Sequence, residues 1–211
     1  PFADDPELAK QTTFQYHASL DRAADLGLHY GVIHAAGFRT GTTRETWLPL
    51  WVDYMGQMAE YAGRAGIILC LENAAHTFFL QDVVHILRQV NSPWLRMTLD
   101  TGHAQMPRHS TLDLIGAAYQ GYSDMNAFIQ QEHDLIFTLH IHDNHLQEDD
   151  HLVLGDGKGD FTYLRLLRDL GFDRAWTFEH YIDDNWESID VATQRLRSLL
   201  DGEATTKRSI P

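Results

Sequence analysis

Acidic side chains stand at the ends of short apolar runs in this sequence. Glu72 follows five apolar residues, Asp100 ends a run that begins at residue 95, and Glu179 follows Trp-Thr-Phe. A carboxylate at the end of a buried run has lost its water and needs a compensating positive charge. Either an ion pair or a divalent metal ion would supply that charge, so each acid alone leaves both interpretations open.

Histidines recur at spacings that suit metal ligands. His140 and His142 lie two residues apart, so on a strand they point to the same face, and Asp149 and His151 repeat this spacing. Histidines two apart also occur as core residues with satisfied hydrogen bonds. His103 follows Asp100 in the segment DTGH, which a turn capped by an aspartate explains equally well.

All of these structural explanations would have to hold together in one chain with 13 histidines. A shared metal site explains the set more simply. Oxygen and imidazole ligands without a thiolate suit Zn²⁺, Mn²⁺, Co²⁺ or Mg²⁺ and do not choose among these ions.

Short apolar runs that alternate with helical patterns must position these side chains. The runs predict strands near 31–37, 66–74, 95–104, 136–144 and 175–181. The patterns predict helices near 6–26, 43–64, 79–91, 110–131, 160–171 and 186–200, with Asp160 as the N-cap of the helix near 160. Such alternation is typical of parallel strands joined by right-handed crossovers.

The fold class follows from where the candidate ligands stand. Each run carries a metal-capable residue toward its C-terminal end, and no glycine-rich phosphate loop follows the first run. Five strand ends meet at one point only if the sheet curls around it, as in a (β/α)8 TIM-type barrel.

Composition bounds the remaining possibilities. The 211 residues form one expected domain, with a polar tail at about 201–211, and no apolar run reaches the ~18 residues of a membrane span. A net charge of −14 argues against nucleic acid as a partner. The single cysteine, Cys70, fits a reducing, cytoplasmic setting. Self-association into a homo-oligomer stays open.

At these residues the sequence resembles the xylose-isomerase-like barrels, a superfamily that includes sugar phosphate isomerases and epimerases and endonuclease IV. The resemblance extends from about His34 to Glu179. Its motifs, in chain order, are VIH, LEN, LDTGH, HIHD, DDHLVLGDG and FEH. As an ordered set they are specific to the superfamily but distinguish poorly among its members.

The resemblance implies a central metal ion with four ligands, which are Glu72, Asp100, His140 and Glu179. A second set matches the ligands of an additional zinc ion in the nuclease: His103, Asp149 and His151. His34 matches a ligand of the nuclease's remaining zinc ion. His140 is preferred to His142 because the family's ligand precedes an acid as H-x-x-D, here Asp143. We expect His142 and Lys158 to contact the substrate.

The sequence departs from the family at its beginning. The family barrel has three strands before the one that bears His34, whereas about 30 residues precede it here and read as one helix. We therefore expect a barrel that lacks its first strands, with open edges at the strands near 31–37 and 175–181. Either the front of the protein is missing from this sequence, which we favour, or another chain covers the gap.

The resemblance implies an isomerase or epimerase whose substrate is a small sugar, sugar phosphate or polyol. The metal would stabilise an enediolate while Glu72 and Glu179 move protons. A ketose 3-epimerase is disfavoured, because Leu146 stands where that subgroup has a substrate-binding arginine. The alternative is a phosphodiester hydrolase like endonuclease IV, favoured by the second ligand set. The net charge of −14 and the lack of a basic, aromatic loop disfavour it. A non-catalytic metal-binding scaffold ranks third.

Overall fold

The computed structural model describes residues 6–34, 43–73, 80–106, 124–182 and 186–202. Its strands are β1 (Tyr30–His34), β2 (Ile68–Glu72), β3 (Leu95–Asp100), β4 (Ile136–Ile141) and β5 (Trp176–Phe178). Its α-helices are α1 (Pro6–Asp25), α2 (Arg44–Ala65), α3 (Leu80–Val90), α4 (Met125–Glu132), α5 (Tyr163–Asp169) and α6 (Glu187–Asp201). Short 3-10 helices, η1 (His103–Gln105) and η3 (His133–Leu135), follow β3 and precede β4.

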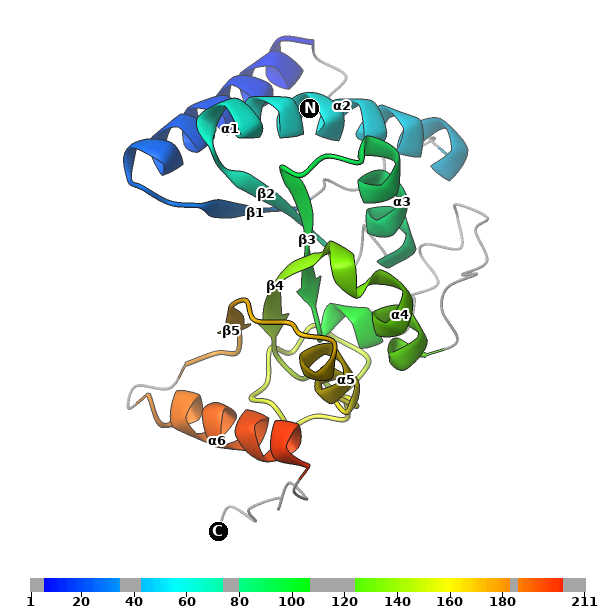
Figure 1. Ribbon diagram of the computed structural model, residues 1–211, viewed down its shortest axis with the longest axis vertical. Coiled ribbons are helices and arrows are strands. Elements are labelled where there is room, and N and C mark those ends of the chain that lie inside the picture. Colours follow the sequence, from blue (N-terminus) through cyan, green and yellow to red (C-terminus); the bar gives the residue numbers. More distant parts are fainter. Residues whose placement is uncertain (1–5, 35–42, 74–79, 107–123, 183–185, 203–211) are drawn as a thin grey trace.

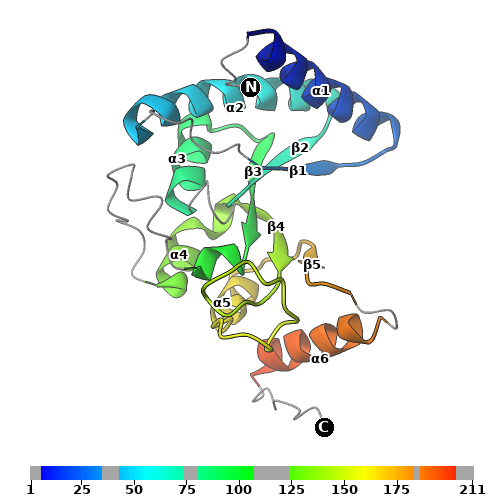
Figure 2. The same cartoon turned by 180° about the vertical axis from the view of Figure 1, so that it is seen from behind.

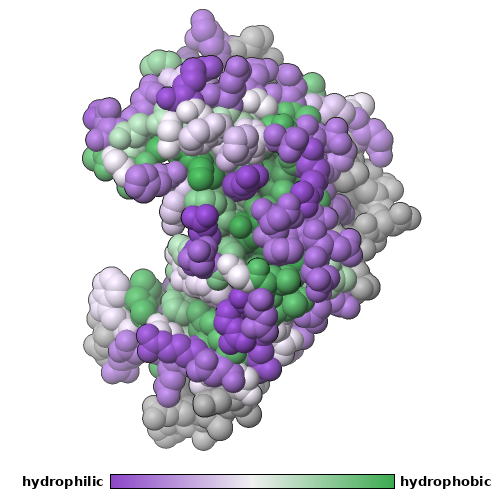
Figure 3. Space-filling view, viewed as in Figure 1, coloured by the Kyte–Doolittle hydropathy of each residue, from purple (hydrophilic) through white to green (hydrophobic). Residues whose placement is uncertain are grey.

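The strands form one parallel sheet in the order β1-β2-β3-β4-β5, so neighbours in sequence are neighbours in space. Two views of the ribbon show that the sheet curls and that the helices lie along its outer side (Figures 1 and 2). The space-filling view shows a hollow between the part around α1 and β1 and the part around β5 and α6 (Figure 3). The described chain is therefore an open portion of a barrel wall.

The apolar core lies between the sheet and the helices. Leu71, Leu99 and Leu139 are fully buried in it, together with Trp51 and Met55 of α2. Successive residues of a strand point to opposite faces. The residue that follows each of these three leucines therefore points to the concave face of the sheet, away from the helices.

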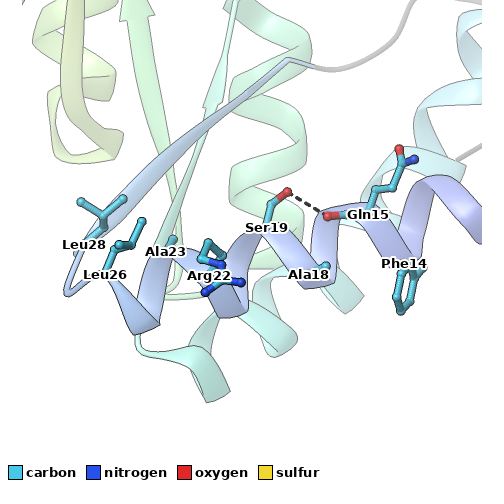
Figure 4. Close-up of a pocket in the computed structure, with 8 residues that line it drawn as sticks. All are labelled: Phe14, Gln15, Ala18, Ser19, Arg22, Ala23, Leu26 and Leu28. Atoms are coloured by element: carbon cyan, nitrogen blue, oxygen red, sulfur yellow. Dashed lines mark hydrogen bonds between the residues drawn. The ribbon is translucent and has the colours of Figure 1, made fainter.

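Both outer edges of the described sheet are open, as predicted. β1 pairs only with β2 and β5 only with β4 among the described strands. Tyr30 and Val32 of β1 are exposed, and so is Phe14 of α1, at 70%. A shallow groove runs along α1 toward β1 (Figure 4); it is lined by Phe14, Gln15, Ala18, Ser19, Arg22, Ala23, Leu26 and Leu28.

Two helix starts differ from the predictions. Asp160 is not an N-cap: α5 begins later, after Thr162, whose backbone N–H donates to the Asp160 carboxylate at 2.9 Å. Asp160 thus forms a side-chain turn ahead of the helix. The helix predicted near 110–131 falls partly outside the described residues, and α4 begins after Asp124, which caps it. None of the described helices is long and apolar enough to cross a membrane.

Candidate metal centre

The strand register brings the predicted ligands to one edge of the sheet. His34 lies opposite Glu72 in the β1–β2 pair, and Asp100 lies opposite His140 in the β3–β4 pair. Glu179 is the first residue after β5. All five stand at the carboxyl ends of parallel strands, the face on which barrel enzymes build their active sites.

Four of these residues form a tight central cluster. Each of Glu72, Asp100, His140 and Glu179 offers a ligand atom within 4.8 Å of the other three. His140 Nδ1 lies 2.9 Å from Glu72 Oε2 and 3.0 Å from Glu179 Oε2. His34 lies beside this group, with Nε2 3.1 Å from Glu72 Oε2. Glu72 and Asp100 are buried, whereas the side chains of Glu179 and His34 are 38% and 60% exposed.

The central cluster fits a divalent ion. Both carboxylate oxygens of Glu72, Oδ2 of Asp100, Nδ1 of His140 and Oε2 of Glu179 are buried atoms that have no hydrogen-bond partner. Adjacent ligands of a small octahedral ion lie about 3 Å apart. The contacts of 2.9 and 3.0 Å between the imidazole and the two glutamates match that spacing.

Charge inside the central cluster is strongly coupled. Burial opposes ionisation of Glu72, but close contacts with the imidazoles of His103, His140 and His34 outweigh it and hold the Glu72 pKa well below its usual range. Burial likewise opposes protonation of His140, and its close contacts with the carboxylates of Glu179 and Glu72 raise its pKa to about 10. The carboxylates are therefore anionic, and a bound metal ion would replace the imidazole protons.

A second cluster lies directly beside the first. One ligand atom from each of His103, His142, Asp149 and His151 lies within 4.8 Å of the other three. Burial opposes protonation of His103, but its hydrogen bond to Asp149 and its contact with Glu72 raise its pKa to about 11. Burial acts against ionisation of Asp149 as well, and His103 lowers the Asp149 pKa to about 2.

Asp100 and His103 connect the two clusters. Asp100 Oδ1 accepts hydrogen bonds from His142 Nε2 at 3.0 Å and from the His103 backbone N–H at 2.7 Å. His103 Nδ1 lies 3.6 Å from Glu72 Oε1. Asp100 is therefore both a capping residue of its turn and a member of the central cluster.

The structure places the two residues predicted to contact substrate in different surroundings. His142 is fully buried between Asp100 and the second cluster. The Lys158 side chain is exposed and forms no ion pair among the described residues, while its backbone N–H donates to Asn144 O at 2.9 Å.

Asn73 has a role in the site that sequence reasoning missed. Its side-chain amide donates to the backbone carbonyl of Asp100 and accepts from the Asp100 N–H, both at 2.9 Å. Its own backbone carbonyl lies 3.0 Å from His103 Nδ1. The only signal in the sequence is its position directly after Glu72 in the segment LEN.

Asp143 also has a role that its place in the H-x-x-D spacing did not reveal. Its buried carboxylate accepts backbone N–H groups of the glycine-rich loop at 3.0 Å from Gly155, 2.9 Å from Gly157 and 3.0 Å from Gly159. A Cβ atom at Gly157 would lie 2.3 Å from Asn144 O, so the loop needs glycine there. Asp143 therefore fixes the loop that carries the second cluster.

Comparisons with known proteins agree with this architecture. Residues 1–201 match the family model described as xylose isomerase-like TIM barrel. No curated protein matches the chain.

Three solved structures illustrate the likeness. A D-tagatose 3-epimerase-like protein is 20% identical, with a TM-score of 0.74 over 96% of this chain and 77% of that one. The IolI protein with a bound zinc atom is 17% identical, with a TM-score of 0.76 over 97% and 74%. The D-psicose 3-epimerase of Clostridium cellulolyticum H10, crystallised with D-tagatose, is 17% identical, with a TM-score of 0.70 over 96% and 74%.

Identities this low establish the fold alone. The structural likeness confirms the predicted fold class, because the five described strands form part of a TIM-type barrel that begins with the strand bearing His34. Since the family model spans nearly the whole sequence, the chain belongs to the xylose isomerase-like TIM barrel family.

Proposed function

We propose that this chain is a divalent-metal-dependent sugar or sugar phosphate isomerase or epimerase, with its catalytic ion on Glu72, Asp100, His140 and Glu179. The observation that carries the proposal is the pair of glutamates on one imidazole, at 2.9 and 3.0 Å, one buried and one partly exposed. Structural neighbours that include a D-tagatose 3-epimerase-like protein and a D-psicose 3-epimerase support the same reaction class.

The two glutamates suit proton transfer at carbon. A bound divalent ion would supply Lewis-acid stabilisation of negative charge on substrate oxygens. Glu179 reaches the open side of the cluster, where its partly exposed carboxylate can take a proton from a substrate carbon. Burial alone would raise the pKa of Glu179, but His140 outweighs it and lowers that pKa, so the carboxylate is ionised and able to act as a base.

Phosphodiester hydrolysis is the second candidate, because the second cluster lies against the first and His34 lies beside Glu72. The net charge of −14 weakens it. Incubation with a duplex that contains one abasic site tests this alternative directly. Strand cleavage that depends on added metal would favour the hydrolase over the isomerase.

The main test uses Glu179→Gln with Glu148→Gln as the matched control, since Glu148 is an exposed acid near the same site. The readout is deuterium uptake from D2O into a panel of free ketoses, aldoses, keto-cyclitols and their phosphates, followed by NMR. Glu179→Gln should lower uptake by about 10²–10⁴-fold, because an amide cannot act as a base. Wild-type uptake in this variant would refute the two-glutamate mechanism, and Glu148→Gln should retain it.

A further inference from the structure

Asp100 is a carboxylate of the central cluster whose two oxygens have different surroundings. Oδ1 accepts the His103 backbone N–H at 2.7 Å and lies 3.0 Å from His142 Nε2. Oδ2 is buried and has no hydrogen-bond partner among the described residues. One oxygen is therefore engaged by the protein, and the other is left for a ligand of the cluster.

The His142 ring is a hydrogen-bond donor to the engaged oxygen. A carboxylate oxygen only accepts, so Nε2 carries a proton in this contact. A protonated nitrogen has no lone pair to give to an ion. The ring is also 0% exposed, so a substrate cannot reach it. His142 therefore acts on the central cluster through Asp100.

Neighbouring segments hold the His142 ring in this position. The ring stacks on His151, with centroids 4.0 Å apart and planes 11° apart. It also packs against Gly102, where a Cβ atom would lie 2.1 Å from the His142 Cε1. The Gly102 carbonyl in turn accepts the Asn144 side-chain amide at 3.0 Å. His151 Nδ1 lies 2.5 Å from the backbone carbonyl of Glu179, so the stacked pair connects two flanks of the central cluster.

We propose that His142 is a positioning residue of the central cluster: its Nε2–H holds Oδ1 of Asp100, so that Oδ2 alone is free to bind the catalytic ion. His142 acts through this carboxylate and touches neither the ion nor the substrate. The inference rests on the proposed function in taking the central cluster as the catalytic site.

Titration of the metal-free full chain with Mn²⁺ tests this role without any substrate. Binding is followed by electron paramagnetic resonance, because the sharp signal of the free ion disappears when the ion binds. His142→Leu loses the donor to Asp100 and should bind Mn²⁺ about 10–100-fold more weakly than the wild type. His142→Gln keeps a side-chain N–H that can reach Oδ1, and it should recover most of the wild-type affinity.

A double-mutant cycle with Asp100→Asn shows whether His142 acts through that carboxylate. If it does, His142→Leu should weaken Mn²⁺ binding no further once Asp100 has been changed. His145→Leu is the matched control, because the exposed His145 imidazole contacts Asp150 instead. It should bind Mn²⁺ as the wild type does.

Three results of the titration would overturn the proposal. They are an unchanged Mn²⁺ affinity in His142→Leu, an equal loss in folded His142→Gln, and losses that add in the double variant with Asp100→Asn.

Nitrogen-15 NMR of the histidine rings in the metal-free wild type guards against a His142→Leu variant that simply fails to fold. We expect a proton on Nε2 of His142, and an unprotonated Nε2 would overturn the proposal. Deuterium uptake is measured separately. Its absence, together with the expected Mn²⁺ affinities, would overturn the proposed function and leave the role of His142 in metal binding intact.

Discussion

The two clusters differ in chemistry although they lie side by side and are connected through Asp100 and His103. The central cluster has three carboxylates and one imidazole, whereas the second has one carboxylate and three imidazoles. With a divalent ion and neutral imidazoles, the first would carry a formal charge of −1 and the second +1. Carboxylate oxygens suit Mg²⁺ and Mn²⁺, whereas imidazole nitrogens suit Zn²⁺, so the two clusters would favour different ions.

The two clusters also differ in what positions them. Central ligands stand on or next to strands whose register is fixed by the sheet. Two members of the second cluster, Asp149 and His151, come from an irregular loop that depends on the buried carboxylate of Asp143. A site on strands keeps its geometry through the barrel core, and a site on a loop needs local bonds or an ion to keep it.

The largest contrast should come from removing one carboxylate of each cluster. Glu72→Gln removes the charge that His140 and His34 contact at 2.9 and 3.1 Å. It should abolish deuterium uptake, a loss of about 10⁴-fold or more, and release the central ion. Asp149→Asn removes the one carboxylate of the second cluster and should lower uptake only by about tenfold, without loss of the central ion. Uptake rates and metal analysis measure both effects, and equal losses in the two variants would remove the distinction between the clusters.

The loop can be weakened without touching a ligand of either cluster. Asp143→Asn places an amide N–H₂ among the N–H donors of Gly155, Gly157 and Gly159 and should cost about 2–4 kcal/mol in the free energy of unfolding. Trypsin should then cut after the exposed Lys158 more rapidly, even with zinc present. Urea denaturation and mass spectrometry measure the two effects.

Asp150→Asn is the matched control for that variant, because Asp150 lies in the same loop but bonds only to His145 among the contacts described. It should leave the free energy of unfolding nearly unchanged, because the contact of an exposed carboxylate is screened by solvent. Similar losses of stability in both variants would mean that the hydrogen bonds of Asp143 do not stabilise the loop more than the contacts of Asp150 do.

A smaller effect is expected at the border of the central cluster. His34 is exposed and contacts Glu72 but stands outside the four residues of the central cluster. His34→Asn should lower deuterium uptake by about tenfold, as for a residue that orients a ligand, and leave the metal stoichiometry unchanged. Loss of one equivalent of metal would instead show that His34 holds an ion of its own.

The sequence predicted the central cluster because its geometry follows from strand ends. Glu72, Asp100 and Glu179 each close a short apolar run, and the carboxyl ends of parallel strands meet at one edge. The preference for His140 over His142 as a ligand came from the H-x-x-D spacing of the family. The structure places His140 beside the two glutamates and His142 beside Asp149.

The second cluster was harder to assemble from sequence. Alternation predicts that His140 and His142 share a face, but His142 lies beyond the end of β4, where the strand periodicity no longer applies. Its partner depends on how the following loop folds back. Three backbone N–H groups of that loop donate hydrogen bonds to the Asp143 carboxylate. Backbone groups can donate from any residue except proline, so such bonds leave little trace in the sequence.

The smallest effect in this comparison should come from Lys158, the only lysine or arginine between residues 143 and 160. Its side chain is exposed and belongs to neither cluster. If it contacts substrate as predicted, an exposed cation would bind a phosphate group weakly. Lys158→Met should therefore raise KM for phosphorylated sugars about 3–10-fold with kcat unchanged, and leave unphosphorylated sugars unaffected. Lys158→Arg should keep the wild-type KM, and added salt should diminish the difference between the two variants. A fall in kcat with KM unchanged would instead make Lys158 a part of the loop that positions the second cluster, with no contact to substrate.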